Sequence, residues 1–107
     1  MKKNYHDLSQ GDLVYIDLNP TKGHEQRGKR PCIILSKPNK YLNYMIGVAP
    51  ITTKAKPFPV HVDLNGTQKI LLEHHRMIDI ESRGFQFVEA VPKEILEECI
   101  EKIKLFY

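Results

Sequence analysis

A loop rich in charged residues runs into an apolar strand near the start of the chain, and it holds the side chains best suited to chemistry. The segment 22–36 reads KGHEQRGKRPCIILS. Pro31 fixes one backbone angle and biases the preceding Arg30 towards an extended conformation. Arg30 therefore stands where a loop punctuated by two glycines meets a strand, a place that makes a side chain both reachable and well aimed. Its guanidinium offers a planar fork of donors that matches phosphate oxygens.

Positive charge is concentrated in the part of the chain that contains this loop. The chain has 107 residues and a formal net charge of +3. Between Lys22 and Lys56 there are eight basic residues and one acidic residue, giving +7, whereas the rest has eight basic and twelve acidic residues, giving −4. This asymmetry predicts a positive face that attracts a polyanion. The alternative is that these basic residues only solvate loop tips.

Length and composition predict a single domain over residues 1–107. No apolar run approaches the roughly 20 residues of a membrane-spanning helix, and the N-terminal MKKNYHDLSQGD lacks the apolar stretch of a secretory signal. Cys32 lies in an apolar strand segment and Cys99 on an apolar helix face, so we expect reduced, buried thiols in a cytoplasmic protein. The spacing of His and Cys does not indicate a zinc site, and we expect neither a metal nor a cofactor.

Short β-type segments separated by turn residues make up most of the chain. The unbroken apolar run after Pro31 indicates a strand that is buried on both faces. An apolar stripe at helical spacing follows Pro92 and includes Ile95, Cys99 and Ile103, which predicts a helix that covers the sheet. The expected fold is therefore mainly β with a C-terminal helix, as a small, curled antiparallel sheet or barrel. The expected strands are 13–18, 31–36, 44–50, 58–64 and 70–78.

Three motifs, in the same order, resemble those of the MazF/PemK toxins. The first combines GDLVYIDLNP, GHEQRGKRP and IILS within residues 11–36 and is long and specific. The second is Pro50–Thr53, and the third joins Leu71–Glu73 to Arg76–Asp79. The resemblance extends from Gly11 into the C-terminal helix.

The resemblance implies the toxin of a type II toxin–antitoxin pair, a metal-independent endoribonuclease that cuts single-stranded RNA at short sequences. It also implies a homodimer of SH3-like barrels, with RNA along the dimer interface and an acidic, partly disordered antitoxin tail that blocks the same groove. We expect that interface to use the third and fifth strands and the helix. The catalytic Arg and Thr of the family fall on Arg30 and Thr52. RNA-binding positions are expected at Glu25, Gln26, Arg27, Lys29, Thr53, Lys54, Lys56, His74, Arg76 and Arg83.

RNA is cut without a metal when its own 2′-hydroxyl attacks the adjacent phosphorus, leaving a 2′,3′-cyclic phosphate and a 5′-hydroxyl. Arg30 suits the extra negative charge of that transition state, and Thr52 can add a hydroxyl hydrogen bond. Arginine is a poor base, whereas histidine is well suited. The family commonly carries Gln at the position of His74, so this chain departs from it there. We therefore hypothesise that His74 or His75 faces the groove and assists proton transfer or contacts a base.

Recognition of RNA bases requires exposed aromatic rings. Phe85, next to Gly84, is the aromatic residue that we expect to be most exposed, and the other candidates are Tyr41, Tyr44, Phe58 and Phe87.

Two other functions remain open from the sequence. The CcdB toxins resemble this fold and poison DNA gyrase by binding it, and a fold alone does not separate the two activities. The second alternative is an RNA-binding module without turnover.

Overall fold

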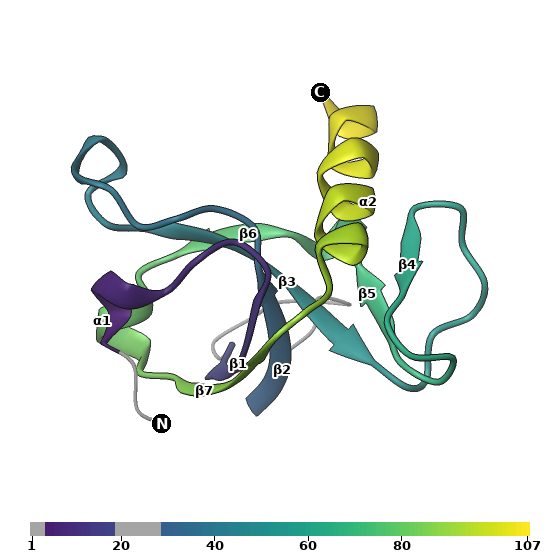
Figure 1. Cartoon of the computed structure of the whole chain (residues 1–107), viewed down its shortest axis with the longest axis horizontal. Helices are drawn as coiled ribbons and strands as arrows, with labels where there is room; N and C mark the ends of the chain where they lie inside the picture. Colours follow the sequence, from purple (N-terminus) through teal and green to yellow (C-terminus); the bar gives the residue numbers. More distant parts are fainter. Residues whose placement is uncertain (1–3, 19–28) are drawn as a thin grey trace.

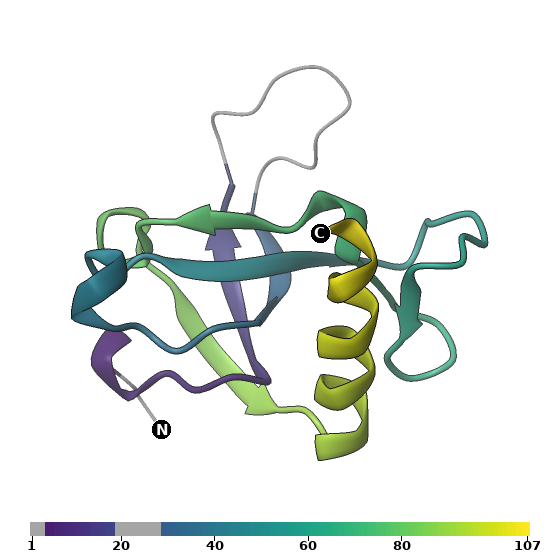
Figure 2. The same cartoon turned by 90° about the horizontal axis from the view of Figure 1, so that it is seen from above.

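Seven strands form one curled sheet within residues 4–18 and 29–107, which are the residues that the computed structural model describes. Figures 1 and 2 show the strands wrapping around an interior, with α2 (Lys93–Ile103) packed on one side and the β4–β5 hairpin projecting beyond it. The sheet is antiparallel and open. Strand β6 (Arg76–Ile78) pairs with β3 and stands outside the linear order of the other six strands. The other strands, in spatial order, are β4 (His61–Asp63), β5 (Lys69–Leu71), β3 (Ile46–Thr52), β2 (Lys29–Ile34), β1 (Asp12–Asp17) and β7 (Gln86–Ala90).

Short helical elements connect the strands of this sheet. The helix α1 (Ile80–Arg83) follows β6, and the Asp79 side chain caps it by accepting a hydrogen bond from the Ser82 amide. The 3-10 turns are η1 (Tyr5–Asp7), η2 (Lys40–Leu42), η3 (Leu72–His74) and η4 (Lys104–Phe106). The mainly β fold with a C-terminal helix is confirmed.

The two central strands are buried on both faces, as the apolar run after Pro31 predicts. Along β2, Cys32 and Ile34 belong to one hydrophobic cluster, whereas Ile33 belongs to a second. Strand β3 alternates in the same way, because Val48 lies in the first cluster and Ile51 in the second. Side chains alternate across a strand, so two clusters on opposite faces hold each strand in place.

Helix α2 covers the second cluster, as its apolar stripe predicts. Ile95, Cys99 and Ile103 pack there, and Cys99 is fully buried. Pro92 is the N-cap residue, one position before the first helical residue. The thiols of both Cys32 and Cys99 are buried and unpaired, and burial raises the pKa of each to about 12. The expectation of buried cysteines is confirmed.

Several strand boundaries differ from the prediction. Strand β2 begins two residues earlier than expected and contains Pro31, which lies opposite Tyr15 of β1. The expected strand 58–64 is reduced to His61–Asp63, because the His61 amide donates to the Phe58 carbonyl in a turn and two prolines flank Phe58. Strand β7 and helix α1 lie in a segment for which no element was predicted.

The expected continuous strand 70–78 is wrong, since η3 divides it into β5 and β6. Both halves pair with the same strand, β3, but in different registers. Continuing the β5 register would bring Glu73 opposite Val48, whereas Arg76 lies there. The 3-10 turn takes up these three residues and buries Leu72 in the second cluster. Residues 73–75 consequently do not alternate across a sheet.

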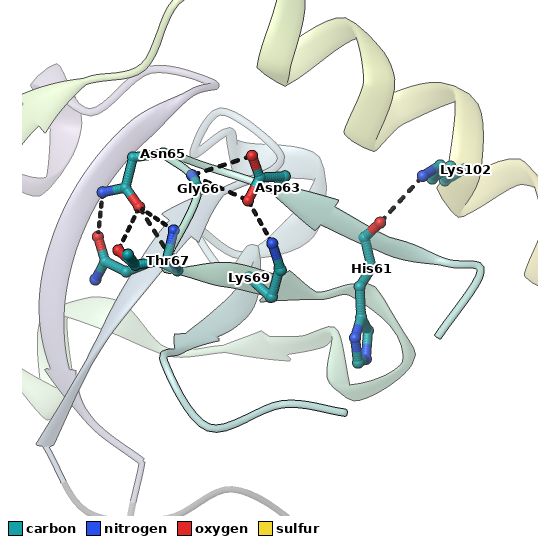
Figure 3. A network of polar contacts seen from close by, with 8 residues as sticks. His61, Asp63, Asn65, Gly66, Thr67, Lys69 and Lys102 are labelled. Carbon is teal, nitrogen blue, oxygen red and sulfur yellow. Dashed lines mark hydrogen bonds and ion pairs between the residues drawn. The ribbon is translucent and has the colours of Figure 1, made fainter. Parts of the chain in front are cut away.

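A tight turn joins β4 to β5, in agreement with the Asn65-Gly66 signal. Gly66 has a φ of +86°, which glycine adopts without strain. Its amide donates to the Asp63 carboxylate, and Lys69 Nζ donates to Asp63 Oδ1 at 2.5 Å (Figure 3). Asn65 Oδ1 accepts from the amides of Thr67 and Gln68. Side-chain hydrogen bonds therefore fix the hairpin that presents His61.

The pH dependence of stability should include a contribution from Asp63. Hydrogen bonding from Lys69 lowers the pKa of this carboxyl below its ordinary value. A lowered folded-state pKa stabilises the fold above the ordinary pKa of about 4, and this contribution is lost as the pH falls further. Asp63→Asn should lower the urea midpoint slightly at neutral pH, and the difference from wild type should vanish in acid. An equal difference at both pH values would contradict this.

Candidate active site

The ends of β2 and β3 open into a groove with a volume of about 610 Å³. One wall comes from these strands and another from the segment that follows β3, and residues of β4, β5 and η3 complete the lining. The groove brings together two predicted catalytic residues and three predicted RNA-binding residues. Its lining comprises Arg30, Pro31, Ile51, Thr52, Thr53, Lys54, Ala55, Lys56, Pro57, Phe58, His61, Gln68, Leu71 and Glu73.

Arg30 and Thr52 share one face of the sheet. The β2–β3 ladder pairs Ile34 with Val48 and Cys32 with Pro50. Continuing the same register by two residues brings Arg30 opposite Thr52, and the alternation of side chains keeps both on the same face as Cys32. Both residues line the groove. The guanidinium and the hydroxyl therefore reach one site from two neighbouring strands.

The Thr52 hydroxyl also organises the opposite wall. Its Oγ1 accepts a hydrogen bond of 3.1 Å from the amide of Lys54. This bond fixes the chain as it leaves β3, in the local pattern that threonine commonly makes with a backbone amide two residues on. Lys54 and Lys56 follow with exposed side chains. Together with Arg30 they give this part of the groove three positive charges, which suits a phosphate backbone.

Arg76 lies close to the same end of the sheet. It stands opposite Val48 on β6, on the face that carries Cys32 and the first cluster. The positive charges of Arg30 and Arg76 both act on the Cys32 thiol, opposing the effect of burial on its pKa. Arg76 is thus a neighbour of the groove, although it does not line it.

A short hydrogen bond links two other groove residues, His61 and Glu73. His61 Nε2 donates to Glu73 Oε2 at 2.6 Å, joining the start of β4 to η3. The His61 side chain is 9% exposed and that of Glu73 is 26% exposed. His61 Nδ1 and Glu73 Oε1 are buried and have no hydrogen-bond partner among the described residues.

Similarity to known proteins identifies the family. A family model for the PemK-like, MazF-like toxin of type II toxin–antitoxin systems matches residues 9–107. This chain belongs to the MazF/PemK toxin family. Endoribonuclease toxin MazF of Escherichia coli strain K12 is 36% identical over 100 residues, covering 89% of each chain. Endoribonuclease PemK of Escherichia coli is 29% identical over 107 residues, covering 91% of this chain and 80% of PemK.

Solved structures of the MazF/PemK family have the same fold. The crystal structure of MazF from Deinococcus radiodurans superimposes with a TM-score of 0.81 at 29% identity, covering 92% of this chain and 94% of that one. MazF in a MazE–MazF structure from the same organism gives a TM-score of 0.77 at 26% identity, covering 92% of this chain and 94% of that one. The sequence-based assignment to this family is confirmed.

Not all of the RNA-binding positions expected from the MazF/PemK family meet in the groove. Arg83 and Lys29 line a separate hollow with Tyr15, and Arg83 Nη1 donates to the Asp17 carbonyl at 2.9 Å. His74 lies on η3 and is not part of the groove lining. The positions Glu25, Gln26 and Arg27 lie outside the described residues.

His75 contacts the backbone of η3 and the end of the chain, and it is not part of the groove lining. Its Nδ1 donates to the Leu72 carbonyl at 2.6 Å, and its Nε2 then accepts from the Tyr107 hydroxyl at 2.6 Å. The ring also packs against Phe106. Both ring nitrogens are therefore engaged in tying η3 to the end of the chain.

Phe58, one of the aromatic candidates from the sequence, is the exposed aromatic residue of the groove. The side chain of Phe58 is 52% exposed, whereas Phe85 is partly buried against the first cluster. Phe58 was expected to begin the strand 58–64, but the turn to His61 places it outside the sheet. The expectation that Phe85 is the most exposed candidate is wrong: Tyr41 is the most exposed candidate among the described residues, at 88%.

A metal-binding cluster and a membrane-spanning helix are both absent from residues 4–18 and 29–107. No group of three or more His, Cys, Asp or Glu side chains there could hold a metal ion. No helix in residues 4–18 and 29–107 is sufficiently long and apolar to cross a membrane.

Proposed function

We propose that this chain, an endoribonuclease toxin of the MazF/PemK family, cuts single-stranded RNA by attack of the 2′-hydroxyl on the adjacent phosphorus. The observation that supports this most directly is the shared groove of Arg30 and Thr52, lined also by Lys54 and Lys56. Polyanion binding needs the lysines, and the chemistry needs a fixed cation at the phosphorus. The groove supplies both: two hydrophobic clusters support the strands that carry Arg30 and Thr52, and the exposed segment after β3 carries the lysines.

Arg30 has the central role in this mechanism. As the O2′–P bond forms and the P–O5′ bond breaks, negative charge grows on the non-bridging oxygens of the phosphoryl group. The Arg30 guanidinium donates to those oxygens and keeps its charge throughout. Because the strand carries it at a fixed place, little reorganisation is needed as the charge develops. The products are a 2′,3′-cyclic phosphate and a 5′-hydroxyl.

The partners follow from the same groove. An antitoxin with an acidic, partly disordered tail would compete with RNA for the positive wall, ordering as it binds. We propose that the toxin acts as a homodimer in the cytoplasm. The proteins of similar structure include MazF in crystal structures of MazE–MazF from Deinococcus radiodurans, which supports an antitoxin partner.

The function is tested with purified protein, a long single-stranded RNA and EDTA. Discrete fragments that carry 5′-hydroxyl and 2′,3′-cyclic phosphate ends support the proposal. Fragments that form only when Mg²⁺ is restored contradict the metal-independent mechanism. Intact RNA combined with inhibited supercoiling by DNA gyrase would favour the CcdB-like alternative, and intact RNA that stays bound would favour a module without turnover.

Thr52→Val should lower the cleavage rate at saturating RNA by roughly fivefold, since a net hydrogen bond contributes about 1 kcal/mol. The variant loses the hydroxyl for the substrate and also the acceptor for the Lys54 amide. Thr52→Ser keeps the hydroxyl and should retain most of the activity. Single-turnover cleavage of one defined RNA measures both. A loss in Thr52→Ser together with a normal rate in Thr52→Val would show that the methyl group, and hence packing, is what matters.

A further inference from the structure

His61 is the one histidine that lines the groove among the residues that the structure describes. His6 lies at the N-terminal end of the fold, with its ring against Tyr5 and Tyr44. His75 has both ring nitrogens engaged, and His74 is outside the lining. The mechanism above lacks a group that takes the proton of the 2′-hydroxyl, and histidine is the side chain best suited to that step.

The bond to Glu73 fixes the tautomer of His61. A carboxylate accepts hydrogen bonds, so the imidazole nitrogen that it contacts, Nε2, carries the hydrogen. In the neutral ring the lone pair is then on Nδ1. That atom is buried without a partner among the described residues. Leaving a buried acceptor unpaired costs free energy, so such a group in a native structure calls for an explanation, and a catalytic role is one.

Contacts on two sides hold the ring in this place. The His61 carbonyl accepts from Lys102 Nζ at 3.0 Å, which ties β4 to α2 (Figure 3). Figure 3 shows the imidazole directed away from that lysine. The ring of Phe58 lies 5.3 Å from that of His61 between centroids, and Phe58 is half exposed. Because Nδ1 is covered in the free protein, bound RNA must displace a neighbour to reach it, and we expect Phe58 to move because its half-exposed ring lies against that of His61.

We propose that His61 is the general base of RNA cleavage and that Glu73 is its positioning residue. This inference rests on the proposed function. His61 Nδ1 takes the proton of the 2′-hydroxyl while O2′ forms its bond to phosphorus. The P–O5′ bond breaks with its electron pair on O5′, and that oxygen takes a proton from water. The Glu73 carboxylate keeps Nδ1 as the accepting nitrogen and stabilises the imidazolium that forms, as a buried carboxylate does in other His-dependent enzymes.

Charges of both signs surround this pair. Glu73 favours the protonated ring, and the positive groove opposes it. On the far side, Lys102 pairs with Glu98 at 2.9 Å, and along the hairpin Lys69 pairs with Asp63, so these charges largely compensate each other. The charged groups that line the groove with His61 are Arg30 of β2, Lys54 and Lys56 after β3 and Glu73 of η3, and the neighbouring elements add the Asp63–Lys69 pair of the hairpin and the Lys102–Glu98 pair of α2.

The inference is tested by single-turnover cleavage from about pH 5 to pH 9, the range over which histidine changes protonation. The wild-type rate should fall in acid as the base becomes protonated. His61→Gln should lower the rate by about 100-fold or more and remove that acid limb, since general base catalysis contributes roughly 10²- to 10⁴-fold. Glu73→Gln should cost about tenfold and move the acid limb to lower pH, because the carboxylate no longer favours the protonated ring. His6→Gln, an exposed histidine outside the groove, is the matched control and should change neither.

A substrate with sulfur in place of O5′ separates a base from an acid. A thiolate leaves without a proton, so the deficit of His61→Gln should persist on this RNA if the residue acts on the 2′-hydroxyl. Recovery of the rate would overturn the role as base. A wild-type rate and acid limb in His61→Gln would overturn the inference while leaving the proposed function intact, provided that Arg30→Ala is inactive. Should His61→Gln not fold, an unmoved acid limb in Glu73→Gln would overturn it. No cleavage by the wild type would overturn the function and the inference together.

Discussion

Arg30→Ala should lower the cleavage rate at saturating RNA by about 100- to 1,000-fold, equivalent to roughly 3–4 kcal/mol of transition-state stabilisation. The loss should fall on the chemical step, since the guanidinium meets charge that develops only as the phosphorus is attacked. Arg30→Lys should recover a minor part, because an ammonium lacks the fork that contacts two oxygens at once. Single-turnover rates and equilibrium RNA binding, measured on the same variants, separate the two effects.

Lys37→Ala is the matched control for this prediction. Lys37 belongs to the same positive stretch of sequence, but its exposed side chain is not part of the groove lining. Its removal should weaken RNA binding slightly, with a smaller salt dependence and an unchanged chemical step. If Arg30→Ala behaves in the same way, with weaker binding and a normal rate at saturation, Arg30 is a phosphate contact and the catalytic role is wrong.

Leu72→Ala should lower the free energy of unfolding by about 3 kcal/mol, within the usual range of roughly 2–5 kcal/mol for a buried leucine. Leu72 is fully buried in the second cluster and anchors η3, the turn that changes the pairing register on β3. The adjacent Glu73 depends on this anchor for its reach to His61. We therefore expect a loss of activity even at temperatures where the variant is folded. Urea denaturation measures the free energy of unfolding, and the cleavage rate at low temperature measures the loss of activity.

Leu105→Ala removes the same atoms from a side chain that is 73% exposed. Its effect on the free energy of unfolding should stay within about 0.5 kcal/mol. Equal losses at the two leucines would mean that Leu72 does not anchor the turn in solution. A destabilised Leu72→Ala with a normal cleavage rate would separate the anchor from the site.

The pairing of Arg30 with Thr52 could be anticipated from the sequence. Each residue stands at the end of an apolar strand segment, and the family motifs mark both. Residues at strand ends keep their places when boundaries shift by a residue or two, as those of β2 and β3 do. The burial of β2 on both faces could also be predicted, because an unbroken apolar run leaves no polar face to contact water.

The pairing of His61 with Glu73 could not be anticipated. It depends on a change of register on β3, which brings η3 beside the start of β4. The burial of Leu72 in the second cluster determines this change of register. The local alternation of polar and apolar residues does not reveal it. The hypothesis about His74 and His75 rested on the family position of His74, and these histidines lie one and two residues beyond Glu73, the carboxylate that lines the groove.

The two walls of the groove are supported very differently. Clusters on both faces clamp the strands that carry Arg30 and Thr52, whereas Lys54, Lys56 and Phe58 project from a segment with exposed side chains. Substitutions on the second wall leave the framework of the first untouched. A randomised library of positions 53–58 should therefore alter how RNA is held on the second wall while the strands that carry Arg30 and Thr52 keep their structure.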